Sequence, residues 1–328
     1  MRLIFPVGYS LAATVAILAW QSSFAADPVS AYPSRPVRFV LGQQAGSALD
    51  NGVRSITPAL GEALGAQIVV DNRPGAAGII AMQIGVAATP DGYTLINAGS
   101  PQMIAPFLYK KLDYDLFRDF VAIARLTTVQ NCLVMNPGFA PNSVRSRIDL
   151  AKSKPGQINM ASAGVGSASH LAGTLFATMT GVQVLHVPYN GGASAVTALI
   201  SNEAQFMVTP LSATLGQIRA GRLKVLAVGG QTRAPQLPDV PTIQEEGVNG
   251  YLSVGWNGIF APKGTPAAAV TRLVGALTGI MSKPDMKERI ARAGVEPGLM
   301  TGAEFTKFMH EDMARFGRAV KAANLIAR

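Results

Sequence analysis

A run of small and hydroxylated residues gives the sequence its clearest chemical signal. The run is Ser162-Ala163-Gly164-Val165-Gly166-Ser167-Ala168-Ser169-His170, and it joins a β-rich segment to a helical pattern. Small side chains leave backbone N–H groups accessible, and the first N–H groups of a helix lack intrahelical partners and lie at the positive end of its dipole. We therefore expect this loop to hold a carboxylate through amides and hydroxyls. Its candidate ligand contacts are Ser162, Gly164, Gly166, Ser167, Ala168 and His170.

Three other junctions have the same character. They are Gly46-Ser47-Ala48-Leu49-Asp50, Arg73-Pro74-Gly75-Ala76-Ala77-Gly78 and Asn97-Ala98-Gly99-Ser100, each after a β-rich run. Unpaired backbone N–H groups are expected where such loops enter helices, so each junction is a further place for an anion. The candidate contacts outside the first loop are Gln43, Gly46, Ser47, Asp50, Gly75, Asn97, Ser100, Tyr189, Asn190 and Thr209.

Two of these candidates have a structural alternative. An acid near a helix start interacts favourably with the helix dipole, so a structural or water-holding role for Asp50 is favoured over direct contact with a ligand. Tyr189 follows Pro188 at a strand end. Packing and hydrogen bonding of the Tyr189 hydroxyl to a ligand both remain open.

Nucleotide, hydrolase and metal chemistry lack support. The loop from Gly164 to Ser169 has serine where the dinucleotide fingerprint needs its third glycine, and no lysine follows as in a P-loop. Gly192-Ala193-Ser194-Ala195-Val196 lacks the final glycine of a nucleophile elbow. A hydrolase using Ser167 and His170 remains a distant alternative, since no third orienting group is evident. With one cysteine and three dispersed histidines, we expect no metal site and no cofactor, although a site built from carboxylates alone stays open.

Composition narrows the class of protein further. The 328 residues are 48% hydrophobic and 14% charged, with a formal net charge of +9. This excludes a disordered chain and leaves room for two lobes with sizeable cores. The basic residues occur as scattered pairs such as Arg35/Arg38 and Lys110/Lys111, without a long basic run. We therefore expect no nucleic-acid partner, because its electrostatic footprint is normally clustered.

The first 25 residues have the pattern of a signal peptide. Arg2 supplies a positive start, residues 3–20 are apolar, and Ser23-Phe24-Ala25 places small residues where a signal peptidase cuts. The alternative is a retained membrane helix, but Pro6 and Gly8 disfavour it. We predict cleavage after Ala25 and export of a soluble mature chain to the periplasm.

The mature chain alternates strand and helix patterns, which favours α/β architecture with parallel strands. His186 lies inside one strand pattern and is expected to pack there. Thr265-Pro266 has the form of a helix cap followed by proline, and Thr301-Gly302-Ala303-Glu304 that of a capping box. The expected strands are residues 36–41, 67–70, 93–96, 132–135, 158–161, 184–187, 206–208 and 225–228; the expected helices include 49–64, 78–88 and a C-terminal helix whose apolar stripe is Phe305, Phe308, Met309, Met313, Phe316 and Val320.

Over nearly all of the mature chain, the sequence resembles the Bug-type extracytoplasmic solute-binding receptors of the tripartite tricarboxylate transporter family. The order and spacing of several segments carry the resemblance. These segments are Tyr32-Pro33-Ser34-Arg35-Pro36-Val37-Arg38, Val70-Asp71-Asn72-Arg73-Pro74-Gly75-Ala76-Ala77-Gly78, Pro90-Asp91-Gly92-Tyr93-Thr94-Leu95, the loop 164–171, Val187-Pro188-Tyr189-Asn190-Gly191-Gly192, Leu226-Ala227-Val228 and Leu237-Pro238-Asp239-Val240-Pro241-Thr242.

The resemblance implies a two-lobed, periplasmic-binding-protein-like (Venus flytrap) α/β fold with a ligand cleft between the lobes. Residues 26–128 and 250–328 would form a discontinuous first lobe and residues 129–249 the second. Such a receptor is not an enzyme. It would bind a small organic acid through loop amides and hydroxyls and, acting as a monomer, deliver it to membrane transporter subunits. Docking on a membrane sensor kinase is the alternative.

The first loop departs from the family pattern, which usually has a proline-rich, aromatic-containing run and two glycines. This chain has Gly42-Gln43-Gln44-Ala45 and then Gly46-Ser47, although Asp50 and Arg54 are retained. Asn190 stands where lysine is frequent, and Gln205 where an acid is frequent. The resemblance therefore leaves the identity of the acid open.

We expect the exported protein to begin at Ala26, because the small residues Ser23 and Ala25 occupy the two positions that a signal peptidase reads. N-terminal sequencing of protein released from the periplasm checks this. Membrane-retained protein with Met1 intact would contradict it.

Overall fold

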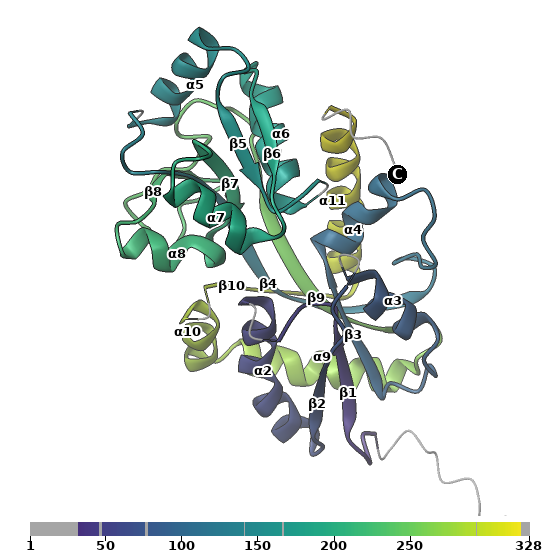
Figure 1. Cartoon of the computed structure of the whole chain (residues 1–328). Coiled ribbons are helices and arrows are strands. Elements are labelled where there is room, and N and C mark those ends of the chain that lie inside the picture. The colour runs from purple at the N-terminus through teal and green to yellow at the C-terminus, as the bar shows by residue number, and fades with distance from the viewer. Residues whose placement is uncertain are drawn as a thin grey trace, which may run out of the picture.

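The computed structural model shows an α/β protein of two lobes (Figure 1) and describes residues 32–45, 48–75, 78–140, 142–165, 167–292 and 294–322. The predicted signal peptide, residues 1–25, lies outside these ranges. None of the helices within them combines the length and apolar character needed to span a membrane.

Lobe A begins with three parallel strands, of which β1 is the middle one. Its residue Phe39 pairs with Val70 of β2 and with Leu95 of β3. The elements are β1 (Val37–Leu41), α2 (Ala48–Leu64), β2 (Ile68–Asn72), α3 (Ile79–Val86), β3 (Thr94–Gly99) and α4 (Ser100–Leu108). Helices α2 and α3 each cross from one of these parallel strands to the next, as the alternating sequence pattern predicts. The predicted strands at 36–41, 67–70 and 93–96 are confirmed.

Lobe B repeats this arrangement around β5, which pairs in parallel with both β6 and β7. Its elements are α5 (Val144–Ser153), β5 (Asn159–Ser162), α6 (Ala168–Thr180), β6 (Leu185–Pro188), α7 (Gly192–Ile200), β7 (Phe206–Pro210), α8 (Leu211–Arg219) and β8 (Lys224–Val228). The four strands predicted here from residue 158 onward are confirmed. In Figure 1 the helices α5 to α8 surround these strands, so the lobe has its own helical cover.

The long strand β4 joins the two lobes. β4 (Phe120–Met135) pairs with β9 (Val254–Pro262) and β10 (Glu296–Thr301) in lobe A, and its last residues pair with β7 and β8 in lobe B. The strand order is therefore β2-β1-β3-β9-β4-β7-β5-β6. The chain then returns to lobe A, where α9 (Ala267–Met281), α10 (Pro284–Arg292) and α11 (Gly302–Ala322) complete it.

The sequence analysis identified only residues 132–135 of β4 and missed β9. Polar residues such as Arg125, Thr128 and Asn257 interrupt the apolar pattern in these strands. The predicted cap at Thr265 is also wrong, because α9 is capped at Pro266. The Thr265 hydroxyl instead donates to the Pro262 carbonyl at 2.8 Å, which closes the turn after β9.

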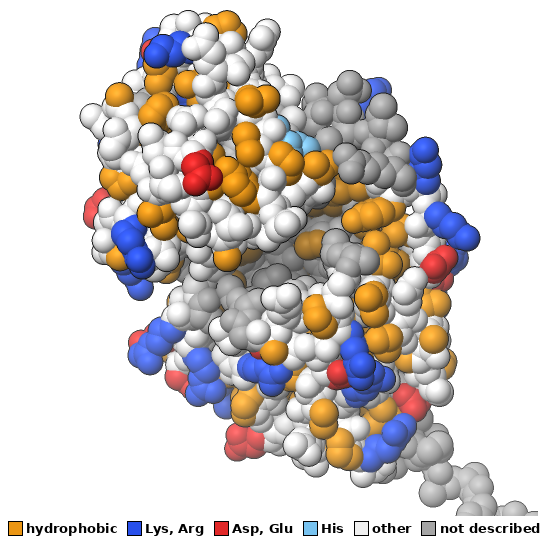
Figure 2. All heavy atoms as spheres, viewed as in Figure 1, with side chains coloured by type: hydrophobic (Ala, Val, Ile, Leu, Met, Phe, Trp, Pro, Cys, Tyr) orange, Lys and Arg blue, Asp and Glu red, His pale blue; other side chains and the backbone are white. Residues whose placement is uncertain are grey.

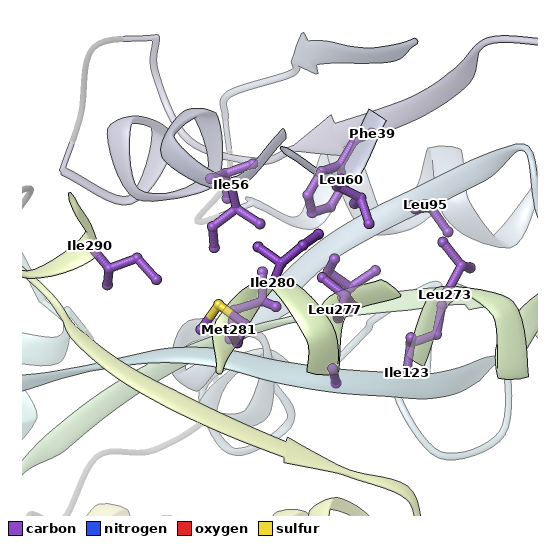
Figure 3. Packing of buried hydrophobic residues seen from close by; sticks show 14 of the residues in the cluster. Phe39, Ile56, Leu60, Leu95, Ile123, Leu273, Leu277, Ile280, Met281 and Ile290 are labelled. Atoms are coloured by element: carbon purple, nitrogen blue, oxygen red, sulfur yellow. The ribbon is translucent and has the colours of Figure 1, made fainter. Parts of the chain in front are cut away.

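Separate apolar cores hold the two lobes. In lobe A, Ile56 and Leu60 of α2 and Phe39 of β1 face Leu277 and Ile280 of α9 (Figure 3). A fully buried side chain of this kind contributes roughly 1.5–3 kcal/mol. A second cluster, which includes Leu133, Phe176 and Phe206, forms the core of lobe B, and Tyr251 from the segment before β9 packs into it. The predicted stripe on α11 is core as expected, since Phe305, Phe308, Met309, Met313 and Phe316 pack in one cluster and Val320 in another.

Gly99 ends β3 directly against β9, which leaves no room for a side chain. A Cβ at this position would overlap the carbonyl oxygen of Trp256 and lie 3.0 Å from Asn257 Cα. We expect Gly99→Ala to lower the free energy of unfolding by about 1–3 kcal/mol, because the backbone of β9 must move. Urea denaturation measures this.

Gly275→Ala is the matched control, since Gly275 lies inside α9 and its Cβ would meet nothing within 4 Å. That change should stabilise by roughly 0.5–1 kcal/mol through helix propensity. Equal effects from both alanines would contradict the close approach of β3 and β9.

Candidate functional site

The carboxyl ends of the parallel strands in the two lobes face each other across the middle of β4. Gly99 at the end of β3 and Thr127 of β4 both pair with Asn257, while Pro210 at the end of β7 pairs with Asn131. Positions 127 and 131 are separated by roughly 13 Å at about 3.3 Å per residue. Figure 2 shows the surface hollowed between the lobes at this level. Open α/β sheets bind ligands at such carboxyl ends.

Hydroxyl groups shape the loop after β5. Ser167 caps α6, and its Oγ accepts from the His170 N–H at 3.2 Å. Ser169 Oγ accepts from Ala163 N–H at 2.9 Å, and Ser162 Oγ accepts from Gly164 N–H at 3.2 Å. These contacts fix the loop at the first turn of α6, whose first residue, Ala168, lines a cavity together with Ser100 of α4. Among the described residues, the N–H groups of Ala168 and Ser169 have no acceptor.

Two stacked imidazoles lie beside this loop. His170 of α6 and His186 of β6 lie with ring centroids 3.8 Å apart and planes 8° apart. His186 Nε2 is 2.7 Å from Ser162 Oγ, which ties β6 to the loop. Burial, with a smaller contribution from the nearby His186, lowers the pKa of His170 to about 4, and burial also lowers the pKa of His186. Both rings are therefore neutral near pH 7 and contribute packing and hydrogen bonds.

Ser167 and His170 do not have the contact of a nucleophile with its base. The hydrogen bonds described for Ser167 Oγ join it to the backbone N–H of His170 and to Ser169 Oγ at 3.1 Å. This is the geometry of a helix cap.

Asp50 has charged and polar neighbours that occupy its carboxylate. It is 1% exposed and accepts from Arg54 Nε at 2.9 Å and from Asn72 Nδ2 at 2.9 Å. Asn72 Nδ2 also donates to the Gln43 carbonyl at 3.1 Å. The hydrogen bonds around the Asp50 carboxylate link α2, the end of β2 and the loop after β1. This geometry fits the structural role that the sequence favoured for Asp50.

Asn97 and Ser100 are fixed to β9. Asn97 Nδ2 donates to the Gly258 carbonyl at 3.1 Å and to Asn257 Oδ1 at 3.3 Å, while Asn257 Nδ2 donates to Thr127 Oγ1 at 2.6 Å. Ser100 Oγ accepts from Trp256 N–H at 3.0 Å. A buried polar network thus crosses from β3 to β4 at the floor of the cleft. Gly75 occupies an exposed turn with φ 130° that favours glycine.

The remaining candidates lie at the ends of β6 and β7. Tyr189 N–H donates to the Ser162 carbonyl at 3.0 Å and its ring packs partly against the lobe B core. Asn190 is exposed, and Thr209 is 2% exposed beside β4. Gly46, Ser47 and Gly166 lie outside the described residues.

Metal and thiol chemistry find no support in the described part of the chain. It contains no group of three or more His, Cys, Asp or Glu side chains arranged to hold a metal ion. The Cys132 thiol is fully buried in β4, and burial raises its pKa to about 12. A protonated, inaccessible thiol is inert.

Sequence reasoning missed two buried residues at the strand crossing. Asn131 Nδ2 donates to Ser253 Oγ at 2.6 Å, which joins the middle of β4 to the segment before β9. These residues lie 122 positions apart, so only recognition of β9 as the neighbour of β4 could have paired them.

Fold and cleft together define a two-lobed α/β binding protein. The sequence model described as "Tripartite tricarboxylate transporter family receptor" matches residues 53–325, so the chain belongs to this family and the resemblance is confirmed. Receptors of this family are periplasmic solute-binding proteins.

Three solved structures are similar to this chain. Rpa4515 of R. palustris with adipate is 30% identical, with a TM-score of 0.82, and the match covers 90% of this chain and 100% of that one. The periplasmic binding protein BugD is 32% identical, with a TM-score of 0.77 and coverage of 90% and 100%. MatC of Rhodopseudomonas palustris with bound malate is 28% identical, with a TM-score of 0.74 and coverage of 88% and 100%.

The histidine stack predicts an acid-sensitive fold. The pKa of His170 is about 4 in the folded protein and 6.5 without the fold's influence, so the unfolded chain binds more protons between these values. Stability from this residue is fully present above about pH 6.5 and is lost as the pH falls towards 4. The melting temperature, measured from pH 7 to pH 4, should therefore fall less steeply in His170→Gln than in the unmodified protein.

His310→Gln provides the control, since His310 is an exposed residue of α11 that stacks on Phe117. Its pH profile is the reference with which the profile of His170→Gln is compared. An unaltered profile in His170→Gln would show that the stack does not oppose protonation.

Proposed function

We propose that this chain is an exported receptor that captures a small organic carboxylate between its lobes and hands it to a membrane transporter of the tripartite type. The observation that carries the proposal is the facing of two sets of strand ends across the cleft, with the start of α6 on one side and that of α4 on the other. Helix starts favour negative charge, and here they come from both lobes.

The ligands of the similar structures support this choice of chemistry. Adipate in Rpa4515 and malate in MatC are both dicarboxylates, and both proteins share the fold over nearly the whole chain. The described hydrogen bonds support a carboxylate at this site, because the Ala168 and Ser169 amides have no acceptor among the described residues. Burial keeps the His170 ring neutral near pH 7 by lowering its pKa to about 4.

The lobe boundaries belong to the same proposal. Residues 26–128 and 250–328 would form lobe A and residues 129–249 lobe B, with the crossings on β4 and before β9. The apolar clusters support these limits to within a few residues: the cluster with Phe39 draws on residues 37–129 and 259–295, and the cluster with Phe206 on residues 133–248 together with Tyr251. We propose a monomeric receptor, with a ligand that stabilises the closed arrangement by its higher affinity for it.

Replacement of Ala168 by proline tests the role of the amides. Position 168 is the first residue of α6, where proline is tolerated, and Ser167 has φ −67° and ψ 160°, which suits a residue before proline. We expect Ala168→Pro to remove one N–H donor and to weaken carboxylate binding by roughly 10- to 100-fold, the range for a hydrogen bond to a charged group. Calorimetry with the acid identified by native mass spectrometry measures this.

Ala267→Pro is the matched control. It places proline at the first residue of α9, whose preceding Pro266 has φ −55° and ψ 135°, and α9 packs against α2 and β4 and contributes no residue to the cavity beside α6. Binding should be unchanged. Equal affinity in both proline variants would remove the α6 amide from the site, and equal binding of the acid and its methyl ester would overturn the anion site as a whole.

A further inference from the structure

A cavity of about 390 Å³ lies between α6 of lobe B and α4 and α11 of lobe A. Its wall on α6 is the stripe Leu171, Leu175 and Met179, spaced four residues apart on one helix face. Ile104 of α4 and Phe316 of α11 also line it. Met179 is 39% exposed, so part of this apolar surface is open to solvent. The volume is that of a small-molecule site.

One end of the cavity is polar. Ser100 of α4, Asn131 of β4 and Ser253 before β9 all line it, and they are 4%, 6% and 7% exposed. They come from three separate segments that meet where the lobes join. A mostly apolar cavity with a few buried, convergent polar groups is the general form of a site for an organic ligand, in which the polar groups orient the molecule.

The charge of the lining selects an anion. Arg315 lines the cavity, and its Nη1 donates to the Leu252 carbonyl at 2.8 Å, next to Ser253 at the polar end. Arg318 also lines the cavity and is exposed. Asp312 pairs with Arg315 but is outside the lining, and no Asp or Glu belongs to the described lining residues. Because the Asp312 carboxylate compensates Arg315, the exposed Arg318 supplies the remaining positive charge of the described lining, which favours an anionic over a cationic ligand.

The cavity adjoins the proposed carboxylate site. Ser100 and Ala168 belong to both, and they are the first residues of α4 and α6. The geometry points to one ligand that uses both: its carboxylate lies at the helix starts and its apolar body lies along α6. Resting on the proposed function, this inference names the ligand class as an organic acid with an alkyl or aryl body, in preference to a compact hydroxylated polyacid.

A homologous series of acids tests the inference. Calorimetry of the mature chain with propionate, butyrate, hexanoate and octanoate, with malate as the compact probe, should show affinity rising roughly threefold per methylene until the cavity is filled. Hexanoate and octanoate should bind more tightly than malate. Affinity that is flat or falls with chain length, while propionate or malate binds, would overturn the inference and leave the proposed function standing. Failure of every acid to bind would overturn both.

Substitutions in the α6 wall of the cavity test where the alkyl chain of the acid binds. Leu175→Ser makes the α6 wall polar and should weaken octanoate binding about tenfold relative to the unmodified chain, which is the loss expected for about two buried methylenes. Propionate should bind as before, since its short body stays near Ala168. Leu185→Ser is the matched control, because Leu185 is 54% exposed on β6 and does not line the cavity. Its octanoate affinity should not change.

Met179→Ser covers the case in which Leu175→Ser fails to fold. Met179 is 39% exposed, so its replacement spares the core, and octanoate should again lose affinity while propionate does not. Octanoate affinity that is unchanged in Met179→Ser and in a folded Leu175→Ser would place the alkyl chain outside this cavity and overturn the inference.

Discussion

The whole architecture depends on one strand that two sheets share. The first part of β4 is hydrogen-bonded to β9 and β10, and its last part to β7 and β8. Its ladder with β9 shifts register between Ala122 and Ala124 and again between Arg125 and Thr127, and its ladder with β8 shifts between Leu133 and Val134. Such irregularities increase local twist and bend a strand. They let β4 leave one sheet and enter the other, which turns the carboxyl ends of both towards a common cleft.

This arrangement explains why many polar side chains at the candidate site form hydrogen bonds to other groups of the protein. Where β3, β9 and β4 meet, buried polar side chains lie among the apolar residues of these strands, and such groups must find partners. Asn97 Nδ2 donates to Asn257 and Asn257 Nδ2 to Thr127, whereas Asn97 Oδ1 has no partner among the described residues; Asp50 is neutralised by Arg54. Fixed in this way, the floor holds the helix starts in place without a free buried charge that would be costly in the empty protein.

Local sequence patterns predicted the elements in which strand alternation or helical spacing is sustained along the whole element. The strand at 37–41, helix α2 and the stripe on α11 follow from alternation and helical spacing, and the loop after β5 follows from its glycines and hydroxyls. Most of β4 and all of β9 were not predicted. Their residues pair at the junction of two sheets and include the buried polar groups of the crossing, so neither strand alternation nor helical spacing is sustained along them. The stack of His170 on His186 and the Asn131–Ser253 bond depend on how separate segments meet, and no local pattern encodes that.

The place where the lobes join also determines how recognition and closure are linked. The cavity wall on α6 belongs to lobe B, and the facing residues Ile104 and Phe316 belong to lobe A. An apolar body between them gains most when both walls cover it, because the favourable free energy grows with the apolar area removed from water. In the proposed site the carboxylate draws on one helix start from each lobe, and an apolar body adds a second set of contacts to both lobes. A ligand with an apolar body would therefore shift the population towards closure more than a compact acid of equal affinity for the open form.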